Sequence, residues 1–331
     1  MTIYYATSAG AGTKSGADWA NAWSKTELYS WISSTATAGD VAYIMQGTYS
    51  GNGISTSKAG SSSNPIKLIG VKTGTTAEPP TVSDYAYSTD RPVLEASSFY
   101  SFTITGGYWW YLNLKFQLGT GNVSLSGCFM NNCYINTGST SKDALRFHGI
   151  LLNTYVLAPN SNATKAGIYA QICYRCMSEA GDGNAFNVYT YGVKTIMQSI
   201  AKDSAIGLNN TGNDTYPAML LDNTIYNCTT GISYSSNDYS PTVILNNSIS
   251  DCTDGCLADQ SGTINYGRLF DHNNWYNNTH DMSFDNGSSE DNSYKGSNDI
   301  DEDPDFIDAS NDDFSISASS GNFNAGIEVI E

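Results

Sequence analysis

Two carboxylic acids in the middle of the chain, Glu179 and Asp203, stand 24 residues apart, and Asn227 and Asp251 follow at the same interval. If the chain repeats its conformation with that period, the four side chains form one column and the two acids lie on adjacent turns. Neighbouring carboxylates raise the pKa of one of them or share a cation, and a glycosidase can use such a pair as acid and base or nucleophile. The alternative, which Asn227 in the same column favours, is a polar ladder that hydrogen-bonds turn amides.

A second acidic group lies near the C-terminus, where Asp299, Asp301, Asp303 and Asp305 alternate with other residues. Alternating carboxylates are typical of calcium loops, although Pro304 stands where an EF-hand needs glycine and no glutamate follows at the twelfth position. The spacing therefore predicts either a structural Ca²⁺ or a solvated acidic cap. No other cofactor is expected.

Aromatic residues are the third candidate group. The segment 108–116 alternates with a period of two, which predicts a strand with one buried face. The side chains expected to face inward are Trp110, Leu112, Leu114 and Phe116. Those expected to face outward, together with tyrosines in loops of later turns, are Trp109, Tyr111, Lys115, Tyr189, Tyr191, Tyr234 and Tyr239. Exposed rings on a polar wall suit sugar stacking or contact with a partner subunit; packing under loops explains them equally well.

The seven cysteines cannot all pair with one another, and closely spaced ones such as Cys173 and Cys176 are compatible with zinc or redox chemistry. A 24-residue alignment instead places Cys173 in the column of Met197, and Cys176 in the column of Ile200. We therefore expect buried, reduced thiols that pack as small apolar groups.

Internal similarity indicates the elements that position these residues. The stretch 220–232 aligns with 244–256 at an offset of 24, and their apolar, Asn, Cys and Gly positions coincide. Each repeat holds two or three short strands broken by Asn, Asp and Gly turns, and it cannot bury its apolar side chains alone. Stacked coils whose backbones pair in parallel solve this problem. The sequence predicts an all-β, single-stranded parallel β-helix with about 24 residues per coil.

Both ends of such a solenoid need covers, because a bare end exposes core and unpaired backbone. Ser24 and Glu27 form a capping box, and Trp23 with Leu28 forms a hydrophobic staple, so we expect a capping helix over the first coil. Three segments follow: an N-terminal strand and capping helix over 1–40, the parallel β-helix over 41–298, and an acidic cap with the last coil over 299–331.

The composition limits the partners. The 331 residues carry a formal net charge of −17, so nothing neutralises phosphates, and neither nucleic acid nor an anionic membrane is an expected partner. No apolar run reaches the roughly eighteen residues of a membrane span. The segment from Met1 has neither the basic nor the apolar part of a secretory signal. We therefore expect synthesis in the cytosol and a place on a virion or extracellular surface after release.

Several segments resemble the right-handed parallel β-helix, pectate-lyase-like superfamily. They are YYAT (4–7), GADWANA (16–22), AGDVAYIMQGTY (38–49), SNPIKLIG (63–70), DPDFID (303–308) and NAGI (324–327). The resemblance spans essentially the whole chain and implies a right-handed solenoid. It implies no single activity, because the superfamily contains lyases, glycoside hydrolases, esterases, phage tailspikes, virion proteins and adhesins. Its lyases generally use an Arg or Lys base beside an acidic calcium cluster; the basic residues of the central coils are Lys165, Arg175, Lys194 and Lys202.

Two functions remain. The main prediction is a non-catalytic protein of a particle or adhesive surface, such as a phage decoration, fibre or receptor-binding component that contacts glycans. The absence of the Asp-Gly-His and Arg-x-Lys elements of the polygalacturonase branch favours it. It would be a homo-oligomer such as a trimer, with virion or cell-surface proteins as further partners. The alternative is a polysaccharide-depolymerising lyase or glycoside hydrolase, with Glu179 and Asp203 as its catalytic pair.

Overall fold

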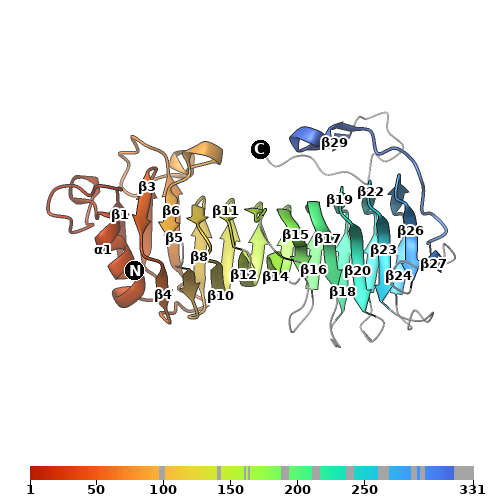
Figure 1. The fold of residues 1–331 in the computed structure, drawn as a ribbon. Coiled ribbons are helices and arrows are strands. Elements are labelled where there is room, and N and C mark those ends of the chain that lie inside the picture. The colour runs from red at the N-terminus through yellow and green to blue at the C-terminus, as the bar shows by residue number, and fades with distance from the viewer. Residues whose placement is uncertain are drawn as a thin grey trace. The chain divides into compact units, whose positions relative to one another are not determined.

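The chain is an all-β parallel β-solenoid of about 8 turns, with about 24 residues per coil (Figure 1). A computed structural model describes residues 1–96, 101–139, 143–159, 162, 165–187, 194–210, 217–235, 242–259, 268–284, 289–290 and 295–316. The fold divides into two units, Met1–Leu157 and Ala158–Glu331. The three segments expected from the sequence stay a prediction.

Unit 1 contains one short helix, α1 (Lys25–Ser30), which continues as a wider turn over Trp31–Thr35. Its strands are β1 (Ile3–Ala6), β2 (Val41–Met45), β3 (Thr48–Gly51), β4 (Ile54–Thr56), β5 (Ile66–Val71), β6 (Val93–Ala96), β7 (Phe102–Ile104), β8 (Trp109–Leu112), β9 (Lys115–Leu118), β10 (Val123–Asn131), β11 (Tyr134–Thr137), β12 (Leu145–Leu152) and β13 (Tyr155–Leu157). The described residues of these strands pair in parallel, for example β6 with β9 and β9 with β11.

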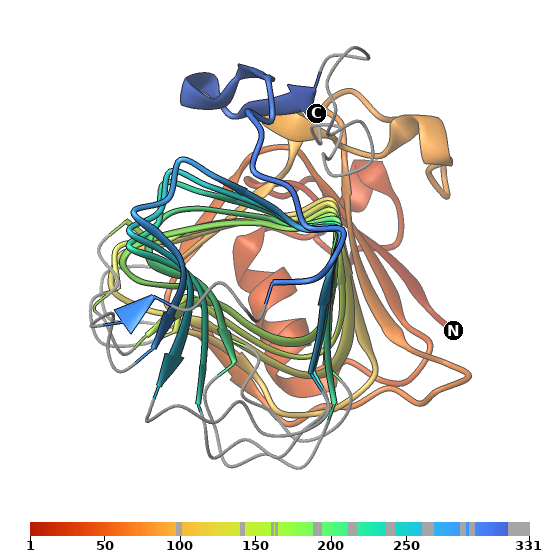
Figure 2. The same cartoon turned by 90° about the vertical axis from the view of Figure 1, so that its right-hand side faces the viewer.

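Unit 2 contains parallel coils followed by a small antiparallel hairpin, β28 with β29. Its strands are β14 (Ala166–Tyr174), β15 (Met177–Asn187), β16 (Lys194–Met197), β17 (Ile200–Asn210), β18 (Ala218–Leu221), β19 (Thr224–Tyr226), β20 (Thr230–Ser235), β21 (Thr242–Leu245), β22 (Ser248–Ser250), β23 (Asp254–Asp259), β24 (Arg268–Asp271), β25 (Asn274–Tyr276), β26 (His280–Phe284), β27 (Ser289–Glu290), β28 (Phe306–Asp308) and β29 (Asp313–Ile316). Figure 2 shows the corners of these coils, green to blue, lying over one another.

Residues that tolerate left-handed backbone set one corner of unit 2. Asp203, Asn227, Asp251 and Asn277 occupy it on successive coils, with φ between 46° and 56°. Asn and Asp adopt this region more readily than other non-glycine residues. They also bind along the column, because Asn227 Nδ2 donates to Asp203 Oδ1 at 2.6 Å and Asn277 Nδ2 donates to Asp251 Oδ1. The recurrent Asn and Asp positions of the sequence therefore fix this turn of each coil.

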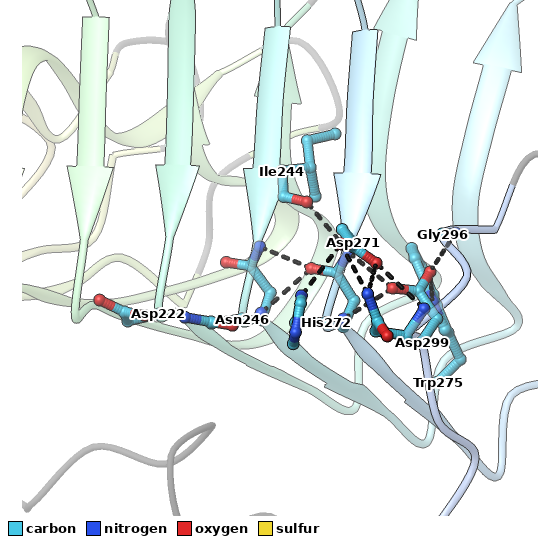
Figure 3. Close-up of polar contacts among 11 residues, drawn as sticks. Asp222, Ile244, Asn246, Asp271, His272, Trp275, Gly296 and Asp299 are labelled. Carbon is cyan, nitrogen blue, oxygen red and sulfur yellow. Dashed lines mark hydrogen bonds and ion pairs between the residues drawn. The ribbon is translucent and has the colours of Figure 1, made fainter.

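A ladder of buried polar side chains runs along a second corner. The Oδ1 atoms of Asn223, Asn247 and Asn273 each accept the backbone N–H of the residue one coil earlier, at 3.0–3.1 Å. Asp299 ends the ladder by accepting from Asn273 N at 2.8 Å (Figure 3). Each asparagine also donates to a strand carbonyl at 3.0 Å. Unpaired buried backbone groups are costly, so this ladder explains why asparagine recurs where an apolar core would otherwise continue.

The N-terminal helix begins as the sequence predicts. Ser24 is its N-cap and forms the capping box with Glu27, whose Oε2 accepts from Ser24 N at 2.9 Å. The helical segment buries Leu28, Trp31 and Ile32. Tyr29 ties it to the coil, because its hydroxyl donates to Tyr49 O at 2.6 Å. The helix is therefore confirmed, while its role as a cap stays a prediction.

The predicted register is wrong by one residue at the first coil of unit 2. Cys173 pairs with Ile196 rather than Met197, and Glu179 pairs with Lys202 rather than Asp203. The reason is that this coil is one residue shorter than the 24-residue coils that follow it. Cys176 accordingly lies beside Ser199, whose Oγ accepts from Cys176 N at 3.1 Å, and not over Ile200. The prediction of burial is confirmed for the described thiols: Cys133, Cys173, Cys176, Cys228, Cys252 and Cys256.

Candidate active site

The predicted acids do come together, but through a third residue. Lys202 on β17 lies opposite Glu179 on β15, and its Nζ is 3.3 Å from Glu179 Oε2 and 3.3 Å from Asp203 Oδ2. A third carboxylate, Asp312 Oδ1, forms an ion pair with the same ammonium group. The site is thus one cation shared by three acids.

Local backbone geometry places two of the three carboxylates. Asp203 sits in the left-handed corner with φ 46°, where Asn227 holds its Oδ1 and leaves Oδ2 for Lys202. Asp312 follows a short turn of the C-terminal hairpin, also with left-handed backbone at φ 67°. Since Asp tolerates this backbone better than most residues, both corners are suited to an acid.

Aromatic packing fixes the hairpin over the coils of unit 2. Phe314 is fully buried and packs with Ile200, and the Tyr226 ring lies 5.5 Å from the Phe314 ring and 6.3 Å from the Phe306 ring. Burial raises the pKa of Tyr226, with a smaller contribution from the charges of Asp251 and Asp203. This packing is what brings Asp312 to Lys202.

Exposure differs among the four charged groups. The Lys202 side chain is 10% exposed, that of Glu179 22%, that of Asp203 40% and that of Asp312 39%. The ammonium therefore lies under its partners, while the carboxylates reach solvent. A nearly buried cation needs this compensation, because removing it from water is expensive.

A shallow depression of about 460 Å³ adjoins the cluster at Asp203. Two other carboxylates, Asp182 and Asp251, line it together with the Asn227 amide and the Thr229 and Thr253 hydroxyls. Such a surface offers hydrogen-bond acceptors and hydroxyls to a sugar. Within the described ranges, no group of three His, Cys, Asp or Glu side chains converges so as to hold a metal ion.

The alternating C-terminal acids do not converge. Asp299 ends the buried ladder and also accepts from Trp275 Nε1 and from Gly296 N, both at 2.9 Å (Figure 3). Asp303 Oδ1 accepts from the backbone N–H of Asp305 at 2.9 Å, and Asp301 is exposed. Calcium binding by these four residues stays a prediction.

The orientation predicted for two of the aromatic candidates is wrong. Trp109 and Tyr111 are buried, whereas Trp110 is 37% exposed. The cause is Asn113, whose left-handed backbone at φ 58° interrupts the alternation. The residues before and after Asn113 therefore alternate between inward and outward in opposite phase. Beyond Asn113 the phase is as predicted, with Phe116 buried and Lys115 half-buried.

The tyrosine candidates of the later coils cannot be placed as side chains. Tyr189, Tyr191 and Tyr239 lie outside the described residues, and Tyr234 is described only as a backbone position of β20 that pairs with Asn210. Sugar or partner contact by these residues stays a prediction.

Sequence reasoning missed the roles of Lys202 and Asp312. Lys202 immediately precedes Asp203, and the one-residue shortening of the first coil is what turns it toward Glu179. Asp312 lies 109 residues after Asp203 in the sequence, and no spacing rule links a hairpin to a distant coil. The one available signal was the apolar character of Phe306 and Phe314 in an otherwise acidic segment, because such side chains need a surface to pack on.

No protein-family model and no curated protein matches the sequence. Among solved structures, the pectate lyase Pel9A matches with a TM-score of 0.64 and 16% identity, covering 98% of this chain and 92% of that one. A rhamnogalacturonan lyase matches with a TM-score of 0.50 and 12% identity, covering 98% and 94%. The protein thus has the pectate-lyase-like parallel β-helix fold.

These comparisons correct the main functional prediction. A non-catalytic virion, phage or adhesion protein was expected, but the two similar structures named above are polysaccharide lyases matched over more than nine-tenths of their own chains. The main prediction of a non-catalytic protein is therefore wrong, and the alternative, a polysaccharide-degrading enzyme, is the better supported of the two. No helix of the described chain is long and apolar enough to cross a membrane.

Proposed function

We propose that the protein cleaves a polysaccharide, with Glu179 and Asp203 as its proton-transferring pair and Lys202 as the group that holds them. The observation that carries this proposal is the shared ammonium, 3.3 Å from one oxygen of each acid. The names of the similar structures, a pectate lyase and a rhamnogalacturonan lyase, support polysaccharide as the substrate class.

Hydrolysis of a glycosidic bond is the reaction that two acids serve most directly. One acid protonates the leaving oxygen while the other acts as nucleophile or as base toward water. The bridged oxygens of Glu179 and Asp203 can be no further apart than twice 3.3 Å. This limit of 6.6 Å includes the whole retaining separation of about 5–5.5 Å but only the lower edge of the inverting range of about 6.5–9.5 Å, so a retaining mechanism fits better.

Elimination is the second candidate, because Pel9A and the rhamnogalacturonan lyase are both lyases. In that reaction a carboxylate would take the proton next to the carboxyl group of a uronic acid, and the Lys202 ammonium would stabilise the negative charge that develops. The products distinguish the two reactions, because elimination leaves an unsaturated sugar end and hydrolysis leaves a saturated one.

The test is incubation of the full chain with a panel of neutral and acidic polysaccharides, with reducing ends and unsaturated ends measured separately. Glu179→Gln keeps the size of the side chain and removes the proton transfer, so we expect its rate to fall by about 100-fold or more while its melting temperature changes little. Asp203→Asn is the second variant, and Asp222→Asn is its matched control. Asp222 has the same left-handed backbone as Asp203 and its Oδ1 accepts from Asn246 Nδ2 at 3.1 Å, but it lies outside the depression.

Two outcomes would count against the proposal. If no polysaccharide of the panel yields new ends, the enzymatic function is rejected. If a substrate is found and Glu179→Gln and Asp203→Asn both retain full activity, the protein is an enzyme but its site lies elsewhere.

A further inference from the structure

A second site lies in unit 1, on the outer face of the parallel strands. Val93 on β6, Lys115 on β9 and Tyr134 on β11 are in register on three neighbouring coils. They line a pocket of about 330 Å³ together with Ser88, Thr89 and Arg91. Small-molecule sites in proteins begin at about this volume.

The cation at the edge of this pocket is held in place by neutral groups. Arg91 Nε donates to Asn132 O at 2.9 Å, another of its nitrogens donates to Asn132 Oδ1, and Nη1 donates to Ser88 O at 3.3 Å. Asn132 is itself fixed, because it is buried and its Nδ2 donates to Asn113 Oδ1 at 2.7 Å. A guanidinium group has five N–H donors, so two remain for a ligand.

The second cation lies against an aromatic ring. Lys115 Nζ is 5.1 Å from the centroid of the Tyr134 ring, and that ring packs edge-on against Tyr155 at 5.1 Å. Tyr134 therefore presents a fixed flat surface beside an ammonium group. Flat rings of this kind stack on the apolar face of a sugar.

Neither cation has an acidic partner in the part of the chain that the structure describes. Among the described residues, no carboxylate lies within ion-pair distance of Arg91 or Lys115. Asp90, which precedes Arg91, accepts a long hydrogen bond from Gln46 Nε2 at 3.4 Å. Lys202 of unit 2, by contrast, is paired with three acids. In a chain with a formal net charge of −17, two uncompensated cations in one pocket form a local site for an anion.

We propose that this pocket binds a sugar acid, a hexose ring that carries a carboxylate. Arg91 and Lys115 hold the carboxylate, because charge-assisted bonds to carboxylate are the strong ones that these groups make. The Tyr134 ring packs against the sugar face, and the Ser88 and Thr89 hydroxyls bind its hydroxyl groups. The inference goes beyond the cleavage proposed for unit 2, and it stands without it, because binding here needs no turnover.

Calorimetric titration of the full chain tests this site directly, with sodium glucuronate, glucose and sodium acetate as separate probes. We expect glucuronate to bind with a Kd on the order of a millimolar, and its affinity to fall as the salt concentration rises. Glucose, which lacks the charge, and acetate, which lacks the ring, are each expected to bind at least about tenfold more weakly.

Lys115→Gln is the main variant, because the Lys115 side chain contacts the Tyr134 ring and makes no side-chain hydrogen bond within the described part of the chain. Its affinity for glucuronate should fall about tenfold or more. Arg91→Gln should have the same effect, although this side chain also ties Ser88 to Asn132, so its folding is checked by melting temperature. Lys67→Gln is the matched control, since Lys67 lies over the Trp110 ring at 4.7 Å outside the pocket and should leave the affinity unchanged.

Three results would overturn the inference. One is the absence of glucuronate binding to the unmodified chain, and another is unchanged binding in Lys115→Gln. The third is a control probe binding as tightly as glucuronate. Equal binding of acetate would show that the pocket recognises the carboxylate alone, and equal binding of glucose would show that it recognises a neutral sugar ring. Because none of these measurements involves cleavage, they are independent of the outcome for Glu179 and Asp203.

Discussion

At the scale of single residues, buried polar and charged groups in unit 2 are compensated by their neighbours. Lys202 is nearly buried and is paired with three acids, and the described thiols of this unit are buried as well. A buried ion pair adds little net stability, but removing one partner is costly, because the rest stays uncompensated. The same residues can therefore support folding and carry chemistry, and substitutions must separate the two roles.

Replacing Lys202 with methionine should destabilise the protein at neutral pH. The change leaves Glu179, Asp203 and Asp312 together without a cation, and we expect the free energy of unfolding to fall by about 2 kcal/mol or more. Urea denaturation measures this change. The double variant Lys202→Met with Asp312→Asn should recover part of the loss, because one repulsive charge is removed. Equal stability of all three proteins would show that the ion pairs are not coupled to folding.

The buried cysteines should be chemically inert in the folded protein. Burial raises the pKa of Cys133 to about 12, and the pKa of Cys173 is raised by its hydrogen bond with Cys176 and by burial. The thiolate is the reactive form, so thiol reagents should react with the six described cysteines only after denaturation. Titration with such a reagent before and after urea tests this. Prompt reaction of Cys173 and Cys176 in the native state, or stoichiometric zinc, would contradict it.

At the scale of elements, the corners of the coils matter more than the strands. The strands of unit 2 are only two to eleven residues long, and they stay in register because Asn, Asp and Ser side chains join each coil to the next. The buried ladder does this with backbone and side-chain bonds at once, and each of its asparagines satisfies groups from two coils. The loss of one member should therefore be felt beyond its own coil.

Asn247→Ala tests this role of the ladder. Asn247 is fully buried and accepts from Asn223 N at 3.0 Å, while its Nδ2 donates to the carbonyls of Leu220 and Leu245. Removing it leaves several buried groups unpaired, at about 1–3 kcal/mol each, so we expect a loss of about 3 kcal/mol in urea denaturation. The control is Asn246→Gly, which keeps the left-handed turn at φ 54° and should cost about 1 kcal/mol or less. Equal effects of the two changes would exclude a special role for the ladder.

The parts of the structure that the sequence predicts are those fixed by short-range rules. The 24-residue repeat, the capping box at Ser24 and the burial of the thiols all depend on neighbours in the chain or on the period. The errors occur where one residue alters the phase: the first coil of unit 2 is one residue short, and Asn113 reverses the alternation after Tyr111. The pairing of Lys202 with Asp312 was out of reach, because it depends on a hairpin that packs on a distant coil.

At the scale of the whole molecule, many of the excess acidic residues lie in turns, where their carboxylates accept hydrogen bonds from nearby side chains and backbone N–H groups. Hydrogen bonds lower the pKa of several half-buried carboxyl groups, with Asn298 acting on Asp271, Asn311 on Asp308, and Ser24 on Glu27. The net charge of −17 opposes this stabilisation, because like charges repel in the compact state. Acidification therefore has two opposite effects, whose balance can be measured.

We expect the hydrogen-bonded carboxylates to dominate that balance. Their ordinary pKa values are 3.8 for Asp and 4.5 for Glu, and the folded-state values are lower. The unfolded chain therefore binds more protons as the pH falls through this range, and the stability that these groups provide above about pH 4.5 is lost below it. The melting temperature at constant ionic strength should stay nearly level from pH 7 to pH 5 and fall steeply below pH 4. A melting temperature that instead rises steadily down to pH 3 would show that relief of charge repulsion outweighs the loss of the turn hydrogen bonds.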